Sequence, residues 1–319
     1  MKKKLISTIL VATILTGCSN QPDVLLTYSE NPSRYQYDQS DNINMAEFFA
    51  TDLTVIPDDL NHMQNSDITA TSSLIVNISD DEVLYANNVY EPMYPASLTK
   101  LITALVVLKH ADLNDMVTIS YKASHITESG AKLCGFKEGD KIKLEALLNC
   151  LLVYSGNDAG IAIAEHVGGS EEGFAKMMNE TAKSVGAVHS NFINPHGLHN
   201  DNHYTTAYDL YLVFNELLKY DKFVSIINQE SYTAQYTDKD NNSKEEQFLS
   251  TNRYLKGIES APKGITVVGG KTGTTSKAGS CLILYSKDDD NKSYISLIMQ
   301  ARDGDSLFSQ MTKLLNMIP

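Results

Sequence analysis

The residues in this chain best suited to chemistry are a serine and a lysine three positions apart, Ser97 and Lys100. The apolar run Leu101–Leu108 follows at once and predicts a helix that begins near Ser97. Positions i and i+3 of a helix lie on one face, so the two side chains would point the same way. A hydroxyl beside an amine that takes its proton, near the free N–H groups of a helix start, is an activated nucleophile.

The same pattern also has an ordinary structural meaning. Serine is a common N-cap, and a lysine one turn later is often a surface charge. A second S-x-x-K pattern, Ser260–Lys263, occurs later in the chain with no helical pattern behind it. Ser97 and Lys100 therefore need support from the rest of the chain.

Two further motifs follow in order. Ser155-Gly156-Asn157 ends the apolar helical run Leu144–Tyr154, and Lys271-Thr272-Gly273-Thr274 follows the strand-like Val267–Gly270. Taken singly, the first motif could be a helix C-cap and the second a turn at a strand edge. S-x-N recurs in the chain, for example at 40–42 and 250–252, whereas K-T-G occurs once. The ordered set of three motifs is therefore the specific signal.

In this order, the three motifs resemble those of the penicillin-recognising serine enzymes, which comprise penicillin-binding proteins and serine β-lactamases. Their flanking residues narrow the resemblance to D-alanyl-D-alanine carboxypeptidases of the low-molecular-weight type. The resemblance extends from about Ser72 to the C-terminus. The stretches that carry it are Pro95–Lys100, Ser155–Ala159, Asn194–Leu198 and Lys271–Thr275.

The resemblance implies a reaction on peptidoglycan stem peptides that end in D-Ala-D-Ala, and on β-lactams. Ser97 would attack the penultimate carbonyl, form an acyl-enzyme and release D-alanine. Lys100 would be the base, which requires that burial beside a second cation, Lys271, lowers its pKa. Ser155 would relay the proton to the leaving amine. The backbone N–H groups of Ser97 and Thr274 would form the oxyanion hole.

The resemblance assigns the remaining positions to substrate binding. Gly273 would let the substrate approach the strand closely, as an added strand would. The histidines at 196, 199 and 203 are expected to be structural, and no metal or cofactor is expected, because no Cys/His cluster has metal-ligand spacing. Relatives place an arginine after the last strand, but Arg302 lies earlier than expected and Leu307 takes the nearer position. The substrate-binding residues are Asn157, Lys271, Thr272, Gly273 and Thr274.

Two other functions compete with the carboxypeptidase. A β-lactamase needs fast deacylation, usually helped by a glutamate between the second and third motifs, yet the stretch Asn191–Asn202 has no acid except Asp201. A receptor for β-lactams or wall peptides needs no proton relay, whereas Lys100 and Ser155 are both present. Endopeptidase and transpeptidase activities would use the same residues, so the motifs do not separate them.

The first residues predict export. The basic Lys2–Lys4 and the apolar Leu5–Leu15 form a signal sequence that is too short to span a bilayer comfortably. It ends in Leu-Thr-Gly before Cys18, which resembles a bacterial lipobox and implies cleavage and lipid attachment at that thiol. The alternative is an ordinary secretory signal in which Cys18 is incidental. The expected organisation is a signal peptide at 1–17, a tether at 18–66 and a catalytic domain at 67–319.

Composition limits the partners. The net charge of −13 argues against nucleic acid and against electrostatic attachment to anionic lipid. We expect a monomer held on the outer face of the bacterial cytoplasmic membrane by its lipid.

Past the lipobox, three cysteines remain, Cys134, Cys150 and Cys281, so they cannot all pair with one another. This odd number favours buried thiols, with a Cys134–Cys150 disulfide as the alternative.

The order of elements predicts an α+β fold. A hairpin over 73–86 precedes a helical middle, and strands over 280–286 and 293–301 precede a final helix from Asp305. A sheet built from both chain ends follows from this order. With the resemblance, the expectation is a β-lactamase/DD-peptidase-like α/β sandwich. It has an antiparallel sheet of about five strands, flanking helices and an inserted all-helical subdomain, with a polar loop over 238–246.

Overall fold

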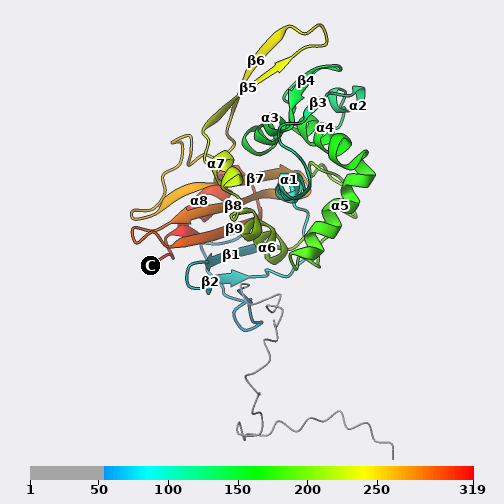
Figure 1. The fold of residues 1–319 in the computed structure, drawn as a ribbon. Helices are drawn as coiled ribbons and strands as arrows, with labels where there is room; N and C mark the ends of the chain where they lie inside the picture. Colours follow the sequence, from blue (N-terminus) through cyan, green and yellow to red (C-terminus); the bar gives the residue numbers. More distant parts are fainter. Residues whose placement is uncertain (1–53) are drawn as a thin grey trace, which may run out of the picture. The chain divides into compact units, whose positions relative to one another are not determined.

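The computed structural model describes residues 54–319, so the predictions for the signal peptide and for Cys18 lie outside the described residues. A five-stranded antiparallel sheet, in the order β2-β1-β9-β8-β7, occupies the centre of this region (Figure 1). Strands from the start and the end of the region pair directly, as β1 does with β9. This confirms the predicted antiparallel sheet. Its strands are β1 (Ser72–Asn77), β2 (Glu82–Asn87), β7 (Thr266–Thr275), β8 (Gly279–Lys287) and β9 (Ser293–Ala301).

Both faces of the sheet are covered by helices. Successive side chains of a strand point to opposite faces, so each strand contributes to both clusters. Leu74 and Val76 of β1 belong to a cluster with helices α1 (Thr99–His110) and α6 (Ala207–Leu217). Ile75 belongs to the opposite cluster, which helix α8 (Gly304–Leu315) covers with its apolar stripe. Burying such an aliphatic side chain contributes about 1.5–3 kcal/mol, so this alternation fixes the register of the strand.

The helical middle of the chain packs on the α1 side of the sheet (Figure 1). Side-chain N-caps begin two of these helices: the Ser170 hydroxyl accepts from the Gly173 N–H, and the Thr206 hydroxyl accepts from the Asp209 N–H. The helices are α2 (Tyr121–Ser124), α3 (Leu144–Asn149), a π-helical turn η3 (Cys150–Tyr154), α4 (Asn157–Gly168), α5 (Glu171–Ser184) and α7 (Asp221–Ile227).

The inserted region is not all-helical, which corrects that part of the expected fold. It carries a second antiparallel sheet in the order β3-β4-β5-β6. Two of its strands have only three residues, too few for an alternating pattern to be visible in the sequence. The strands are β3 (Met116–Thr118), β4 (Lys141–Lys143), β5 (Ser231–Thr237) and β6 (Ser243–Leu249).

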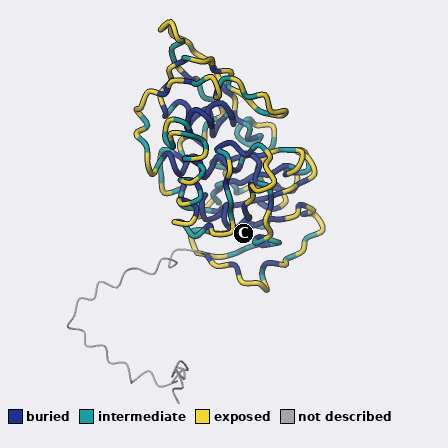
Figure 2. The backbone as a smooth tube through the Cα atoms, turned by 90° about the vertical axis from the view of Figure 1, so that its right-hand side faces the viewer, coloured by how far each residue is buried: buried dark blue, intermediate teal, exposed yellow. Residues whose placement is uncertain are grey.

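The predicted polar loop over 238–246 is also shorter than expected, because β6 begins at Ser243. Residues 243–247 are exposed, and the tip of the β5–β6 hairpin projects at the top of Figure 2. Backbone pairing with β5 holds this strand, so its side chains can be polar on both faces. The first residues of β6 therefore show no hydrophobic periodicity that would predict a strand.

Residues 54–66, expected in the tether, already pack on the domain. The Ile56 side chain is buried in the core, and its carbonyl accepts from the Tyr90 hydroxyl. The Asn61 side chain accepts from the Val89 N–H. Residues 54–66 therefore pack against the part of the chain that was expected to form the catalytic domain. Across the described residues, no helix has the length and apolar character needed to cross a membrane.

Candidate active site

The nucleophile candidate lies where the structure changes from loop to helix. A short 3-10 turn, η2 (Ala96–Leu98), leads directly into α1, which places Ser97 one turn before Lys100. Ala96 has a φ of 48°, an uncommon value for a non-glycine residue. Two side chains hold it there: His203 bonds to the Thr99 hydroxyl at 2.8 Å, and Thr99 donates to the Ala96 carbonyl at 2.8 Å. Buried side chains thus fix the backbone conformation next to Ser97.

Lys100 is fully buried and directs its amine at Ser97. Its Nζ atom lies 3.0 Å from the Ser97 hydroxyl oxygen, 2.7 Å from the Asn157 amide oxygen and 2.7 Å from the His196 carbonyl oxygen. Burial lowers the pKa of Lys100 to about 7, with a smaller contribution from the Lys132 charge. The amine is therefore partly neutral near neutral pH and can accept a proton.

The second motif lies at a break between two helices. The π-helical turn η3 ends at Ser155, which has a left-handed φ of 74°, and α4 begins at Asn157. Ser155 and Asn157 are both buried. The Asn157 N–H donates to the Lys132 carbonyl at 2.8 Å. At this break the Asn157 side chain contacts Lys100 of α1, and the Ser155 side chain contacts Lys271.

The third motif lies on β7, an edge strand of the five-stranded sheet. Lys271 is fully buried, and its amine donates to the Ser155 hydroxyl at 3.0 Å and to the Thr272 carbonyl at 2.9 Å. Burial lowers the pKa of Lys271 well below its usual value, and the charges of Lys100 and Lys132 lower it further. Lys271 and Ser155 thereby join the second and third motifs.

Gly273 is required by the protein itself. A Cβ atom at this position would lie 2.9 Å from the Ser97 nitrogen and 3.0 Å from the Pro95 carbonyl oxygen. Such contacts are too short for real side chains, so only glycine lets β7 pack this closely on η2. The sequence predicted a close approach of substrate at Gly273, whereas the close approach seen here is that of the nucleophile's own backbone.

These residues line one cleft of about 340 Å³. Lys100 and Lys271 lie buried behind it and reach it through Ser97 and Ser155. The second S-x-x-K pattern is elsewhere, since Lys263 lines a separate hollow beside the C-terminus. The cleft contains the predicted Ser97, Ser155, Asn157, Thr272, Gly273 and Thr274.

Three groups of the site were not singled out from sequence. The His196 backbone carbonyl binds Lys100, and a backbone acceptor carries no signal in residue type. Lys132 lines the cleft and lies 4.0 Å from the centre of the Tyr154 ring. Arg253 also lines the cleft, from the segment that follows β6. Neither cation belongs to a motif, so only the fold brings them to the site.

Several other polar residues lie away from the nucleophile. Arg302 is exposed and bonds to Asp303, and it does not line the cleft. Asp201 is exposed and bonds to His199. The thiols of Cys134, Cys150 and Cys281 are free, so the alternative of a Cys134–Cys150 disulfide is wrong in this structure. Within residues 54–319, no three His, Cys, Asp or Glu side chains gather as metal ligands do.

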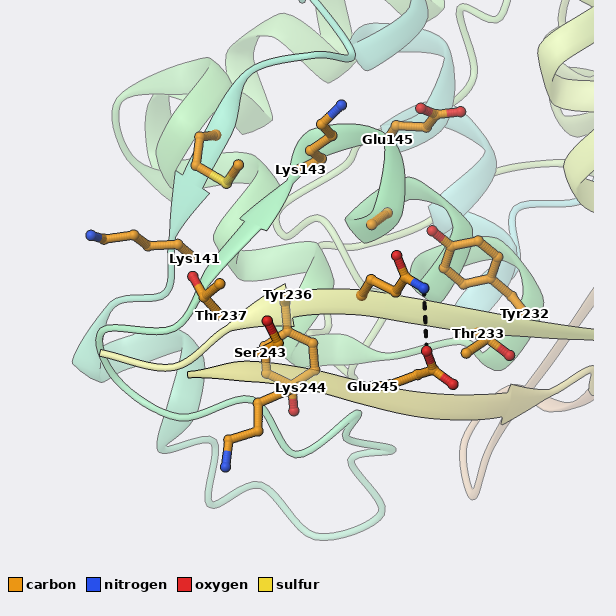
Figure 3. A pocket seen from close by; sticks show the side chains of 13 residues that line it. Lys141, Lys143, Glu145, Tyr232, Thr233, Tyr236, Thr237, Ser243, Lys244 and Glu245 are labelled. Atoms are coloured by element: carbon orange, nitrogen blue, oxygen red, sulfur yellow. Dashed lines mark hydrogen bonds between the residues drawn. The ribbon is translucent and has the colours of Figure 1, made fainter. Parts of the chain in front are cut away.

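A larger hollow of about 700 Å³ lies on the second sheet (Figure 3). Tyr232 and Tyr236 of β5 line it, together with Lys141, Lys143 and Glu145. Glu145 forms an ion pair with Lys222. The hollow contains neither the serine–lysine pair nor the K-T-G strand, so the smaller cleft is the candidate active site.

The fold and the cleft together are similar to those of penicillin-binding DD-peptidases. A solved mutant of the Streptomyces K15 DD-transpeptidase aligns with a TM-score of 0.73 and 25% identity, over 78% of this chain and 97% of that one. A family model described as D-alanyl-D-alanine carboxypeptidase, peptidase family S11, matches residues 59–303, and the chain belongs to this family. The family and fold predicted from the motifs are thereby confirmed.

Curated relatives agree with this assignment. D-alanyl-D-alanine carboxypeptidase DacF of Bacillus subtilis is 32% identical over 254 residues, which are 77% of this chain and 61% of that protein. D-alanyl-D-alanine carboxypeptidase DacC of Escherichia coli K12 is 32% identical over 258 residues, 78% of this chain and 60% of that protein. The chain thus matches about three fifths of the length of each.

Proposed function

We propose that this protein is a serine-type D-Ala-D-Ala carboxypeptidase that removes the terminal D-alanine from peptidoglycan stem peptides. The observation that carries the proposal is the 3.0 Å contact between the Lys100 amine, whose pKa is lowered to about 7, and the Ser97 hydroxyl. A nucleophile and a base in hydrogen-bond reach, with the base held by further groups, are the arrangement that acyl transfer requires.

The acylation step follows from this arrangement. Neutral Lys100 takes the proton of Ser97, and the Ser97 oxygen attacks the carbonyl of the penultimate D-alanine. The backbone N–H groups of Ser97 and Thr274 stabilise the negative charge on the carbonyl oxygen. The tight packing of β7 on η2 at Gly273 supports this role, because it brings the two backbone segments together.

The leaving group needs a proton as the C–N bond breaks. Ser155 is suited to relay it: its own hydrogen is free to point into the cleft and passes to the amine, and the Lys271 ammonium, which donates to the Ser155 hydroxyl, replaces that hydrogen. The leaving D-alanine takes the proton and departs with its carboxylate near Thr272 and Thr274. Water then hydrolyses the ester on Ser97 and returns the free enzyme.

The edge position of β7 supports the way in which a peptide would bind. An edge strand offers unpaired backbone groups, and an extended peptide can add to it as a further strand. Asn157 and Thr274 line the two sides of the cleft and would bind the backbone of such a peptide. Transfer of the acyl group to an amine instead of water would use the same residues.

A direct assay tests the proposal. The purified chain is incubated with a stem pentapeptide ending in D-Ala-D-Ala, and free D-alanine is measured against the Ser97→Ala variant. Release by the wild type and none by the variant is expected. Equal release by both proteins would contradict the proposal, as would no release by a folded wild type.

We further propose that lipid on Cys18 holds the enzyme at the outer face of the cytoplasmic membrane, where residues 1–17 direct it. Expression in a bacterial host with a labelled fatty acid tests this. Label in the wild type and its absence in Cys18→Ser are expected, with the variant released from the membrane fraction. Equal labelling of the two proteins would exclude lipid attachment at Cys18.

A further inference from the structure

We propose that Lys132 binds a carboxylate on the acyl half of the substrate, the part of the stem peptide that precedes the scissile bond. This inference rests on the proposed function and deepens it, because it names a residue that selects among stem peptides of different composition. The group recognised is a carboxylate on the second or the third residue of the stem peptide, as a D-glutamyl or a diaminopimelyl residue provides.

Lys132 belongs to the side of the cleft that the second motif forms. Its carbonyl accepts from the Asn157 N–H at 2.8 Å, and both residues line the cleft. The leaving D-alanine is proposed to depart beside Thr272 and Thr274, on β7. Lys132 is therefore available to the other half of the peptide, which stays on Ser97 after the first step.

The ammonium of Lys132 is exposed and has no ionic partner. Among residues 54–319, no carboxylate, carbonyl or hydroxyl oxygen accepts a hydrogen bond from it. Its Nζ atom lies 4.0 Å from the centre of the Tyr154 ring, and this ring packs on Phe248 with the ring centres 5.0 Å apart. A cation–π contact holds a charge in place without neutralising it. The ammonium is thus positioned at the cleft and still free to bind an anion.

The charge around Lys132 favours an anion further. Burial of part of the side chain lowers the pKa of Lys132, and the charge of Lys256 lowers it again. Both effects disfavour the ammonium in the free protein, and a bound carboxylate would offset both. A substrate group with a positive charge would instead add to the repulsion between the two lysines.

The backbone that carries Lys132 is tied to the start of α4. The buried Asp158 carboxylate accepts from the Cys134 N–H at 3.0 Å and from the Gly135 N–H at 2.8 Å. On the other side of Lys132, Gly130 also lines the cleft, and a Cβ atom there would meet nothing within 4 Å. Lys132 is therefore held in place relative to Asn157, with open space beside it for a ligand.

The distances along a peptide agree with this position. An extended chain advances about 3.3 Å per residue, so the second and third residues lie within roughly 10 Å of the carbonyl that Ser97 attacks. Lys132 is close enough to the reacting groups that its charge, together with burial, lowers the pKa of both Lys100 and Lys271. A carboxylate on either residue therefore falls within the range over which the Lys132 charge acts.

The competing explanation is that Lys132 only tunes the base. If so, loss of its charge would raise the pKa of Lys100 and shift the pH dependence of acylation for every peptide alike. Carboxylate binding predicts something different, namely that the effect of losing Lys132 depends on which carboxylates the peptide carries. The two explanations therefore differ in the discrimination between substrates.

The test measures kcat/KM for D-alanine release by the full chain from three stem pentapeptides. One has free carboxylates on its D-glutamyl and diaminopimelyl residues, and each of the others has one of these two carboxylates converted to the amide. Lys132→Gln is expected to lower kcat/KM for the first peptide roughly 3- to 10-fold. The loss should be smaller for at least one amidated peptide, and that peptide identifies the residue whose carboxylate is bound.

Two further variants control the test. Lys132→Arg keeps the charge and should keep the preference for the free carboxylates, which should weaken as salt is added. Lys137→Gln removes an exposed lysine of the same segment that does not line the cleft, and it should change none of the values. An equal loss on all three peptides, or no loss on any, would overturn the inference. If the folded wild type released no D-alanine from any peptide, the proposed function itself would fail, which is a distinguishable result.

Discussion

The Lys100 amine lies 3.0 Å from the Ser97 hydroxyl and 2.7 Å from the Asn157 amide oxygen, so the proposed base contacts the first and second motifs at once. Lys271 joins the second and third motifs in the same way, through Ser155. The three motifs are therefore one hydrogen-bonded unit around two buried amines. A substitution of any residue in this unit should therefore change the protonation or the position of the other residues.

The first prediction concerns the pH dependence of acylation. Because the pKa of Lys100 is lowered to about 7, the amine is protonated and inactive as a base below that pH and neutral above it. The rate of acylation of Ser97 should therefore rise with pH through about 7 and then level off. Stopped-flow measurement with a β-lactam between pH 5 and 9 checks this. A rate that falls with rising pH would assign the base role to another group.

The second prediction concerns Gly273→Ala. The added Cβ would lie 2.9 Å from the Ser97 nitrogen, so β7 must move away from η2. A displacement of about 1 Å at the reacting groups costs roughly 100-fold in rate, so we expect at least this loss in kcat/KM with the protein still folded. Gly160→Ala is a milder comparison, because its Cβ would meet only side-chain atoms, Leu151 Cδ1 at 3.3 Å and His196 Cβ at 3.4 Å. Activity of Gly273→Ala equal to that of the wild type would show that close packing at Gly273 is not needed.

The site was predictable from sequence where the chemistry demands particular side chains in a fixed order. The motif residues Ser97, Lys100 and Lys271 were found in this way, and so was the helix that follows Ser97. Arg253 was not found, because nothing in its local sequence distinguishes it from a surface arginine. Contacts between distant segments, such as that between Thr251 and Thr272, hold it at the cleft.

The fold, too, was predictable in some elements and not in others. Residues of β1 and β8 are buried on both faces and form apolar runs, so their strands were predicted. The three-residue strands β3 and β4 were missed, and β6 begins before the expected end of the polar loop, because backbone pairing rather than burial holds these residues. The close packing at Gly273 is a contact between segments about 175 positions apart, which a local pattern does not reveal.

The third prediction concerns acid stability. Burial lowers the pKa of His203 to about 4, whereas an unfolded histidine titrates near 6.5. The unfolded chain therefore binds the extra proton first, and the free energy of unfolding should fall as the pH drops from about 6.5 to about 4. The loss from this one group is about 3 kcal/mol.

Neutral His203 has a specific structural role. It accepts from the Ile193 N–H through Nδ1, so its other nitrogen, Nε2, donates to Thr99 beneath Ala96. Denaturant titrations at several pH values measure the effect. The His203→Gln variant should lose part of the pH dependence, whereas His199→Gln, whose ring is more exposed, should retain it. An unchanged slope in His203→Gln would contradict the assignment.

The fourth prediction concerns β-lactams. Benzylpenicillin should acylate Ser97 and remain attached, because the single acid of the 191–202 stretch, Asp201, is 89% exposed and lines a different hollow. No carboxylate from that stretch is then positioned to activate water. Intact-protein mass spectrometry after removal of free penicillin should show one persistent adduct. Rapid return to the unmodified mass would indicate a β-lactamase.

The most direct test of the account traps the acyl-enzyme formed from the substrate itself. The chain is mixed with an ester analogue of the stem peptide, quenched with acid within its first turnovers and mapped by peptide mass spectrometry. The account predicts an acyl group on Ser97 and none in the Ser97→Ala variant. An acyl group on another residue, or continued release of the ester's alcohol leaving group by Ser97→Ala, would contradict it.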